Sequence, residues 1–403
     1  MRILFVSDVS IHQVIGGAER VLSEQATRLR QRGHSVHILT RRLAHHENDH
    51  DIIGGVHEWR YEVTDSCPLS FLASTLINSR RLFRSLQRRF SFNCINIHQP
   101  FSALSIISSR SARGIPTIYT CHSLSFEEFQ SRNPIPRPAA GRIFHRLNRG
   151  VRWCVEGRIL KRSDRIVVLS RFTRDKVERT YGIPGDAITI IHGGVDIERF
   201  HPAADRREIR RRLDLPPDGL IVLTVRNMVP RMGLDTLLRA FSDVIAAVPD
   251  VRLVLGGEGP LKDDLVTLAR DLGIAEHTIF AGFVPESELP HYYQMADIFV
   301  LPTRELEGFG LVTLESLACG VPVLGTPVGG TVEILDRLDR GYIFSDTGFE
   351  AMAALITRIC RAFRDNPAYQ SDVASRCRTF VEEHFSWDRN VTSLERLFSH
   401  RGA

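Results

Sequence analysis

No apolar run in this chain reaches the roughly 18 residues that a membrane-spanning helix requires. The first eight residues are too few, and become acidic too soon, to form a secretory signal peptide. The apolar residues 3–6 instead predict a buried first strand. From these absences we expect a soluble chain that stays in the cytoplasm.

The chain also has few cysteines, and their spacing argues against two further classes of protein. Seven cysteines are scattered through 403 residues, and no two of them form a C-x-x-C pair. An odd number without short spacings fits neither a disulfide framework nor a structural zinc site. This usage is typical of a reducing compartment.

A complete G-x-G-x-x-G fingerprint followed by an acidic residue is missing as well, which argues against a dinucleotide-dependent oxidoreductase. The one stretch that looks like a metal site is residues 45–51, which contain three histidines and a D-x-D pattern. No apolar strand precedes this stretch, so we predict a solvated loop and no bound metal.

What the chain does contain is a repeated alternation of short apolar strands and longer helical segments. The strands are expected at residues 3–6, 35–39, 94–97, 117–120, 165–169, 220–225, 251–255, 278–281, 298–301 and 322–325. Such an order predicts parallel sheets covered by helices on both faces. The fold class is therefore α/β, with doubly wound, Rossmann-like architecture.

The length of the chain predicts two domains, because 403 residues exceed the size at which one core stops growing. A proline-bearing, charged segment at residues 201–207 suits a boundary between them. We place the domains at residues 1–202 and 203–385, and we expect a helix at 386–403 to cross back onto the first domain.

The net charge of +5 is concentrated in two arginine-rich stretches, residues 80–89 and 142–165, both with a helical pattern. Solvated helix faces are the simplest interpretation. The functional alternative is attraction to an anionic acceptor or to anionic lipid headgroups, at the inner face of the membrane. Nucleic acid is not expected as a partner, since no recognised binding motif accompanies these charges.

Polar residues that directly follow the predicted strands are the candidates for chemistry, because ligands bind at the carboxyl ends of parallel strands. Gly16 and Gly17 precede a helix whose first amides are suited to a phosphate. His122 follows another strand, where an imidazole is placed to donate to a sugar hydroxyl or a leaving phosphate, and His98 stands at a further strand end. Taken singly, these are also the features of ordinary turns and structural histidines.

The densest signal is the segment 302–315, which predicts a strand end, a glycine turn and a helix. It places Glu307 and Glu315 eight residues apart, about two helical turns. Gly308 and Gly310 would let the backbone approach a diphosphate at the helix N-terminus. By themselves the two glutamates would be taken for a helix cap and an exposed helix residue.

The spacing Glu307-x7-Glu315 resembles the E-x7-E signature of the retaining glycosyltransferases of family 4, which have the GT-B fold. Further segments match that family in the same order, namely residues 16–20, 192–196 with Phe200 and Pro202, 256–260, 296–297 and 328–330. The resemblance thus extends over nearly the whole chain.

The resemblance implies a role for each site residue. Glu315 would bind the donor ribose, and Glu307 the transferred sugar together with the amides of Phe309, Gly310 and Leu311. His122 matches the family's cleft histidine. The donor base is expected near Phe283 and Val284, and the amides of Gly16 and Gly17 near the phosphates or the acceptor.

One segment departs from the family, which has an Arg and a Lys five residues apart to neutralise the diphosphate. Asn227 and Met232 stand at these positions here, whereas Arg226 and Arg231 each lie one residue earlier and keep the separation. We predict that these arginines reach the same phosphates. If neither did, the leaving group would lose a large stabilising interaction and turnover would be slow.

The resemblance implies transfer of a hexosyl group from a nucleotide diphosphate sugar, with a UDP-sugar favoured and a GDP-sugar as the alternative. The acceptor would be a glycan, a lipid-linked sugar or a small molecule, and no cofactor or metal would be needed. Two other functions remain open: a nucleotide-sugar epimerase or phosphorylase on the same fold, and a nucleotide-sugar-binding homologue with impaired turnover.

Overall fold

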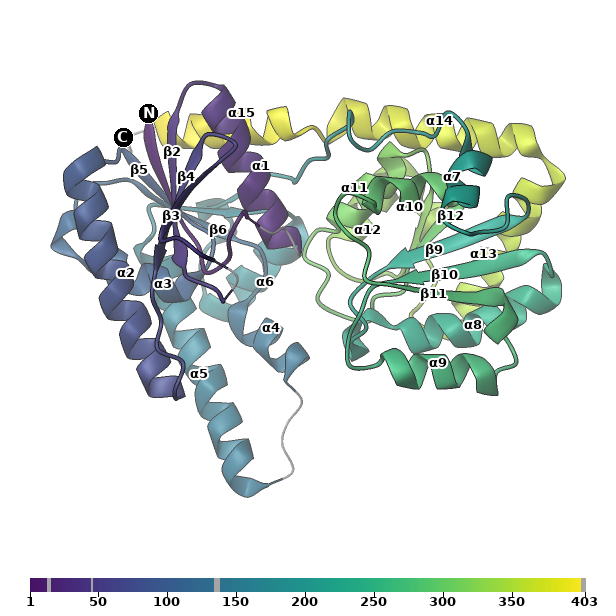
Figure 1. Ribbon diagram of the computed structural model, residues 1–403, viewed down its shortest axis with the longest axis horizontal. Helices are drawn as coiled ribbons and strands as arrows, with labels where there is room; N and C mark the ends of the chain where they lie inside the picture. Colours follow the sequence, from purple (N-terminus) through teal and green to yellow (C-terminus); the bar gives the residue numbers. More distant parts are fainter. Residues whose placement is uncertain (13–15, 45, 134–137, 400–403) are drawn as a thin grey trace. The chain divides into compact units, whose positions relative to one another are not determined.

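The computed structural model describes residues 1–399 except 13–15, 45 and 134–137. It divides into two compact units, the first made of Met1–Gly193 with Trp387–Ala403 and the second of Gly194–Ser386 (Figure 1). None of the helices in the described part of the chain is both long and apolar enough to cross a membrane.

The first unit is built on an eight-stranded sheet in the order β3-β4-β2-β1-β5-β6-β7-β8. Its strands are β1 (Arg2–Val6), β2 (Ser35–Arg41), β3 (His50–Ile53), β4 (Val56–Tyr61), β5 (Cys94–Ile97), β6 (Thr117–Cys121), β7 (Arg165–Val168) and β8 (Ile188–Ile190). All neighbours pair in parallel except β3, which is antiparallel to β4.

Helices cover both faces of this sheet because alternate residues of each strand point to opposite sides. The helices of this unit are α1 (Gly17–Gln31), α2 (Pro68–Phe90), α3 (Pro100–Ile107), α4 (Ser125–Arg132), α5 (Ala139–Arg162), α6 (Arg171–Tyr181) and α15 (Trp387–Ser399). In β1, Leu4 and Val6 pack in the core beneath α2, α3 and α5, whereas Ile3 and Phe5 pack in the core beneath α1 and α15.

The C-terminal helix α15 belongs to the first unit, where it packs along α1 (Figure 1). Val391 and Leu394 are completely buried in the shared core. At the rim of that contact the guanidinium of Arg32 donates to the carboxylate of Glu395 at 2.6 Å.

The division between the units falls after Gly193 rather than near residue 202. The reason is that the segment after Gly193 already has partners in the second unit. The amide of Val195 donates to the carbonyl of Phe385 at 3.0 Å, and the guanidinium of Arg378 donates to the carbonyls of Ile197 and Phe200.

The second unit has a five-stranded parallel sheet in the order β11-β10-β9-β12-β13. Its strands are β9 (Leu220–Val225), β10 (Val251–Gly256), β11 (Thr278–Gly282), β12 (Ile298–Leu301) and β13 (Val323–Gly325). Its helices are α7 (Arg206–Arg212), α8 (Leu234–Ala247), α9 (Lys262–Asp271), α10 (Leu289–Met295), α11 (Leu311–Ala318), α12 (Thr331–Leu338), α13 (Phe349–Asp365) and α14 (Pro367–His384).

Each sheet has one point where the strand order reverses, and such a point opens a crevice at the carboxyl ends of the strands. In the first unit it lies between β1 and β5, and in the second between β9 and β12. These are the places where the fold positions ligand-binding side chains.

Candidate active site

An ion pair between Arg226 and Glu307 occupies the switch point of the second unit. Arg226 directly follows β9 and Glu307 lies in the loop after β12, so adjacent strands bring them together. The Nη2 of Arg226 donates to Oε2 of Glu307 and, at 3.3 Å, to the hydroxyl of Thr303. The two charged side chains are only 8% and 11% exposed, so the pair lies largely out of water.

The backbone around Glu307 is held in a tight and partly strained conformation. Leu306 has a φ of 60°, in the left-handed region that a branched side chain rarely adopts. The carbonyl of Glu307 accepts from the amide of Gly330 at 2.8 Å. A Cβ on Gly329 would lie 2.1 Å from that carbonyl oxygen, so the close approach requires a glycine. The fold thus fixes the position of this carboxylate.

Helix α11 begins directly after this loop, and Gly310 is the residue before its first turn. Gly310 has a φ of 88°, and a Cβ at this position would lie 2.1 Å from the hydroxyl oxygen of Thr331. Phe309 and Leu311 on either side of it are buried. The start of α11, with its positive helix-dipole end, is therefore anchored close to Glu307.

Glu315 lies on α11, eight residues after Glu307, and is 3% exposed. Its Oε2 accepts from the phenol of Tyr293 on α10 at 2.9 Å. Glu307 and Glu315 therefore have different partners, an arginine for the first and a tyrosine for the second. A carboxylate held in this way is an acceptor that suits the hydroxyl groups of a ribose.

The shifted arginines both reach the loop that carries Glu307. Besides the contact of Arg226, the Nη1 of Arg231 donates to the carbonyl of Leu306 at 3.2 Å. Met232 is buried, with its sulfur 3.1 Å from Nη2 of Arg226, whereas Asn227 is exposed. The two cations thus converge on one loop, while the two residues at the family's basic positions carry no charge.

Phe283 and Val284 follow β11, two strands away from β9 in the sheet. Phe283 is 61% exposed, so its ring is accessible for stacking. Val284 packs beside Gly256 at the end of β10, where a Cβ on the glycine would lie 2.8 Å from it. Their assignment to the donor base stays a prediction.

In the first unit the predicted histidine is one of a pair. The Nε2 of His122, at the end of β6, lies 3.0 Å from Nδ1 of His98, at the end of β5. Burial lowers the pKa of His122 to about 4 and the pKa of His98 well below its usual value, so both rings are neutral at neutral pH. A neutral His122 is a hydrogen-bonding group rather than a cation.

Gly16 and Gly17 lie at the start of α1, with Gly16 as the N-cap in an extended conformation. The residues just before them, 13–15, lie outside the described part of the chain. At the switch point of this unit, Gln99 accepts from the hydroxyl of Ser7 at 2.6 Å and from the amide of Asp8 at 2.7 Å.

Sequence reasoning did not identify Thr303, Tyr293 or Gln99 as neighbours of the predicted residues. Gln99 had a detectable signal, because it follows β5 by two residues at a strand end. Tyr293 had none, because its phenol meets Glu315 only through the packing of α10 on α11.

The D-x-D segment is not a solvated loop throughout. Residues His50–Ile53 form the edge strand β3, and Asp51 pairs with Arg60, while Asp49 pairs with Arg42. The prediction of a loop was wrong there because β3 is an edge strand of mixed polarity. Among the residues that the structure describes, no three His, Cys, Asp or Glu side chains are grouped to hold a metal ion.

Residues 15–199 match the family described as Glycosyltransferase Family 4, and residues 205–368 match the one described as Glycosyl transferases group 1. Over 251 residues the chain is 33% identical to a GDP-mannose-dependent alpha-(1-6)-phosphatidylinositol monomannoside mannosyltransferase of Mycolicibacterium smegmatis, covering 60% of this chain and 64% of that protein. It is 30% identical over 300 residues to a D-inositol 3-phosphate glycosyltransferase of Actinosynnema mirum, covering 71% of this chain and 67% of that protein. The matches to the mannosyltransferases span less than two thirds of their length.

Two solved structures show the same fold at low sequence identity. The sucrose-phosphate synthase of Thermosynechococcus elongatus superimposes with a TM-score of 0.79 at 22% identity, covering 98% of both chains. Anabaena HepE in complex with UDP and glucose gives a TM-score of 0.76 at 17% identity, covering 99% of both chains. The fold is GT-B, with two Rossmann-like units.

Proposed function

Since this chain belongs to family 4 of the glycosyltransferases, we propose that it transfers a hexosyl group from a nucleotide diphosphate sugar to a hydroxyl group of an acceptor. The observation that carries the proposal is the buried Arg226–Glu307 pair at the switch point of the second unit. A cation suited to the diphosphate of a donor and a carboxylate suited to its sugar lie side by side there, with little contact with water.

The donor competes with this pair when it binds. The diphosphate draws Arg226 and Arg231 toward its oxygens, which releases the Glu307 carboxylate to accept from sugar hydroxyls. Glu315, whose buried carboxylate accepts from Tyr293, accepts from the ribose hydroxyls as well. Phe283 stacks on the base.

The reaction that we propose retains the configuration at the anomeric carbon. The bond between that carbon and the diphosphate oxygen breaks, and the acceptor oxygen bonds to the carbon on the same face. The proton of the acceptor hydroxyl goes to the departing phosphate. The arginines and the start of α11 stabilise the charge of the leaving group, and neither a protein nucleophile nor a metal takes part.

The identity of the donor is the most specific part of the proposal. A relative at 33% identity is named for GDP-mannose, so we propose GDP-mannose as the first donor to test. A UDP-sugar, which the family resemblance favours, is the second, and HepE was solved with UDP. The names of two relatives include phosphatidylinositol and inositol phosphate, so we propose an acceptor with a phosphate or a lipid, and a glycan as the alternative.

A second candidate function is that of a homologue that binds the nucleotide sugar with impaired turnover. It is favoured by Met232, which is buried and uncharged at a position where the family has a cation. The two candidates differ in whether Arg226 and Arg231 supply the missing charge.

The experiment that tests the transferase proposal measures the binding of GDP-mannose and of a panel of UDP-sugars by thermal shift, and the release of nucleoside diphosphate from each. Each donor is incubated with the full chain and a lipid extract or inositol phosphate, with and without EDTA. We expect one donor to turn over only with acceptor, and EDTA to leave the rate unchanged. Binding without turnover under every condition would favour the second candidate, and no binding of any donor would refute both.

A further inference from the structure

Helix α5 of the first unit exposes an unusual number of large apolar side chains. They are Ile143, Phe144, Leu147, Val151 and Trp153, with exposed fractions between 42% and 63%. Ile143, Leu147 and Val151 recur every four residues and so share one face of the helix. A face of this kind marks a contact surface when nothing in the chain covers it.

The charged side chains that α5 exposes are all basic. Its basic residues are Arg142, Arg146, Arg149, Arg152, Arg158, Lys161 and Arg162, whereas its one acidic residue, Glu156, is completely buried. The exposed surface of the helix therefore combines apolar side chains with cations and has no anion. This combination is typical of helices that lie in the interface of an anionic bilayer.

Towards the C-terminal end of the helix, the same face carries cations in place of apolar side chains. Cys154, Arg158 and Lys161 follow Val151 at spacings of three and four residues. Arg158 and Lys161 have no ion pair or hydrogen bond within the described part of the chain. The two cations are thus available to anions from outside the molecule.

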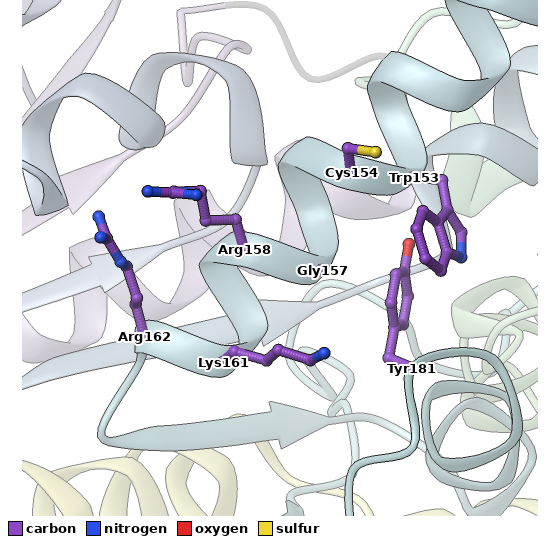
Figure 2. Close-up of a pocket in the computed structure, with 7 residues that line it drawn as sticks. All are labelled: Trp153, Cys154, Gly157, Arg158, Lys161, Arg162 and Tyr181. Carbon is purple, nitrogen blue, oxygen red and sulfur yellow. The ribbon is translucent and has the colours of Figure 1, made fainter.

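A pocket of about 360 Å³ lies at this cationic end, between α5 and the end of α6 (Figure 2). The rings of Trp153 and Tyr181 stack with centroids 5.8 Å apart, and Lys161 extends toward Tyr181. Tyr181 is fixed because its phenol donates to Glu156 at 2.8 Å, and its ring lies against Gly157, where a Cβ would be 3.0 Å from it. The pocket is therefore a preformed site with aromatic and cationic walls.

The length of α5 places its apolar half beyond the sheet. The helix has 24 residues, about 36 Å, whereas the following strand β7 has 4 residues, about 13 Å. Because β6 and β7 are parallel, α5 runs back from the carboxyl ends of the strands, so its N-terminal half projects at that end. Figure 1 shows this half of α5 extending away from the sheet.

We propose that α5 docks this protein on the surface of an anionic phospholipid bilayer, with its apolar N-terminal half in the interface and the Trp153–Lys161 pocket on a lipid phosphate. Seven cations oppose self-association of α5, because a second copy would present the same charge. The inference adds a partner to the proposed function and does not depend on sugar transfer. It places the bilayer along the face of α5 that runs from Ile143 to Lys161.

The test is flotation of the full chain with vesicles of phosphatidylcholine alone or mixed with phosphatidylglycerol, in the absence of any sugar donor. We expect binding to the mixed vesicles only, weakened by salt and unaffected by soluble glycerol phosphate. Ile143→Gln with Leu147→Gln, and separately Arg158→Gln with Lys161→Gln, should each lower the partition coefficient by about tenfold or more.

Two control variants are matched to these changes, the first in the exposure of the altered side chain and the second in the number of cations removed. Ile52→Gln alters an apolar side chain on β3 that is 60% exposed, as Ile143 is, and should leave binding unchanged. Arg239→Gln with Arg270→Gln removes two cations from α8 and α9 and should have less than a threefold effect. Equal loss in the α5 variants and their controls, or no binding of the wild-type chain, would overturn the proposal. So would a wild-type dimer that the α5 variants dissociate, since a second copy would then be the occupant.

Discussion

Arg226 and Glu307 form a nearly buried ion pair, and pairs of this kind contribute little net stability because both charges lose their hydration. Removing one partner is costly, however, because it leaves an unpaired charge with little access to water. Arg226 and Glu307 are therefore coupled, and the coupling is measurable without a ligand.

A double-mutant cycle tests this coupling. Arg226→Gln and Glu307→Gln should each lower the unfolding free energy of the second unit by about 3 kcal/mol, and the double variant by clearly less than the sum. The exposed pair of Arg211 and Glu208, whose side chains are 58% and 63% exposed, serves as the control and should give under about 1 kcal/mol. Additive effects at Arg226 and Glu307, measured by chemical denaturation, would contradict the account.

At the residue scale the family motif identified Glu307 and Glu315, because a fixed spacing after a strand end constrains the backbone, whereas Arg226 was predicted although it stands one residue before the family's basic position. Their partners were not predictable. Tyr293 and Thr303 have common side chains in ordinary positions, and only tertiary packing decides that they meet Glu315 and Arg226.

At the scale of elements, the start of α11 depends on the conformation of Gly310. Gly310→Ala should destabilise the second unit by more than about 2 kcal/mol. The added Cβ would lie 2.1 Å from the hydroxyl oxygen of Thr331, and alanine would also have to adopt a positive φ. Gly273→Ala is the matched control, since Gly273 also has a positive φ but no atom within 4 Å. It should cost only about 1 kcal/mol. Equal costs in thermal denaturation would show that the contact with Thr331 is not tight.

Helix α15 should contribute strongly to the first unit, although it is the last element of the chain. Leu394→Ala should lower the unfolding free energy of that unit by about 2–5 kcal/mol, because the side chain is completely buried against α1. Glu383→Ala, on an exposed position of α14, should change it by less than about 0.5 kcal/mol. Protection of α1 from hydrogen exchange that is the same with and without Leu394 would contradict the packing.

Elements with runs of Val and Ile were predictable, since such runs specify buried parallel strands. The strand β3 was not, because its edge position leaves its residues only partly buried and its polar residues look like a loop. The boundary between the units was displaced for a related reason: contacts of residues 195–200 with α14, not local composition, decide where the first unit ends.

For the whole molecule, buried neutral histidines predict sensitivity to acid. Burial lowers the pKa values of His122 and His37 from 6.5 to about 4, and it lowers the pKa of His98 well below its usual value. Between pH 6.5 and about 4 the unfolded chain therefore binds protons that the folded chain does not, so stability falls as the pH falls through this window. Each histidine contributes up to about 1.4 kcal/mol per pH unit.

Urea denaturation monitored between pH 7 and pH 4.5 checks this dependence, with the transition of the first unit followed by the fluorescence of its tryptophans. His122→Asn and His37→Asn should each reduce the slope. A stability that is flat across the window, or that rises as the pH falls, would show that these rings are protonated in the folded chain.

The central claim is that the edge of the second unit around Glu307 and Glu315 binds a nucleotide diphosphate sugar, and calorimetric titration with GDP and UDP tests it most directly. Wild type should bind one of them, and Glu315→Gln should raise its dissociation constant by about tenfold or more, because a charged acceptor for the ribose is lost. Glu350→Gln, on an exposed residue of α13, should leave it unchanged. Binding of neither nucleotide by wild type, or equal binding by wild type and Glu315→Gln, would contradict the assignment of this site.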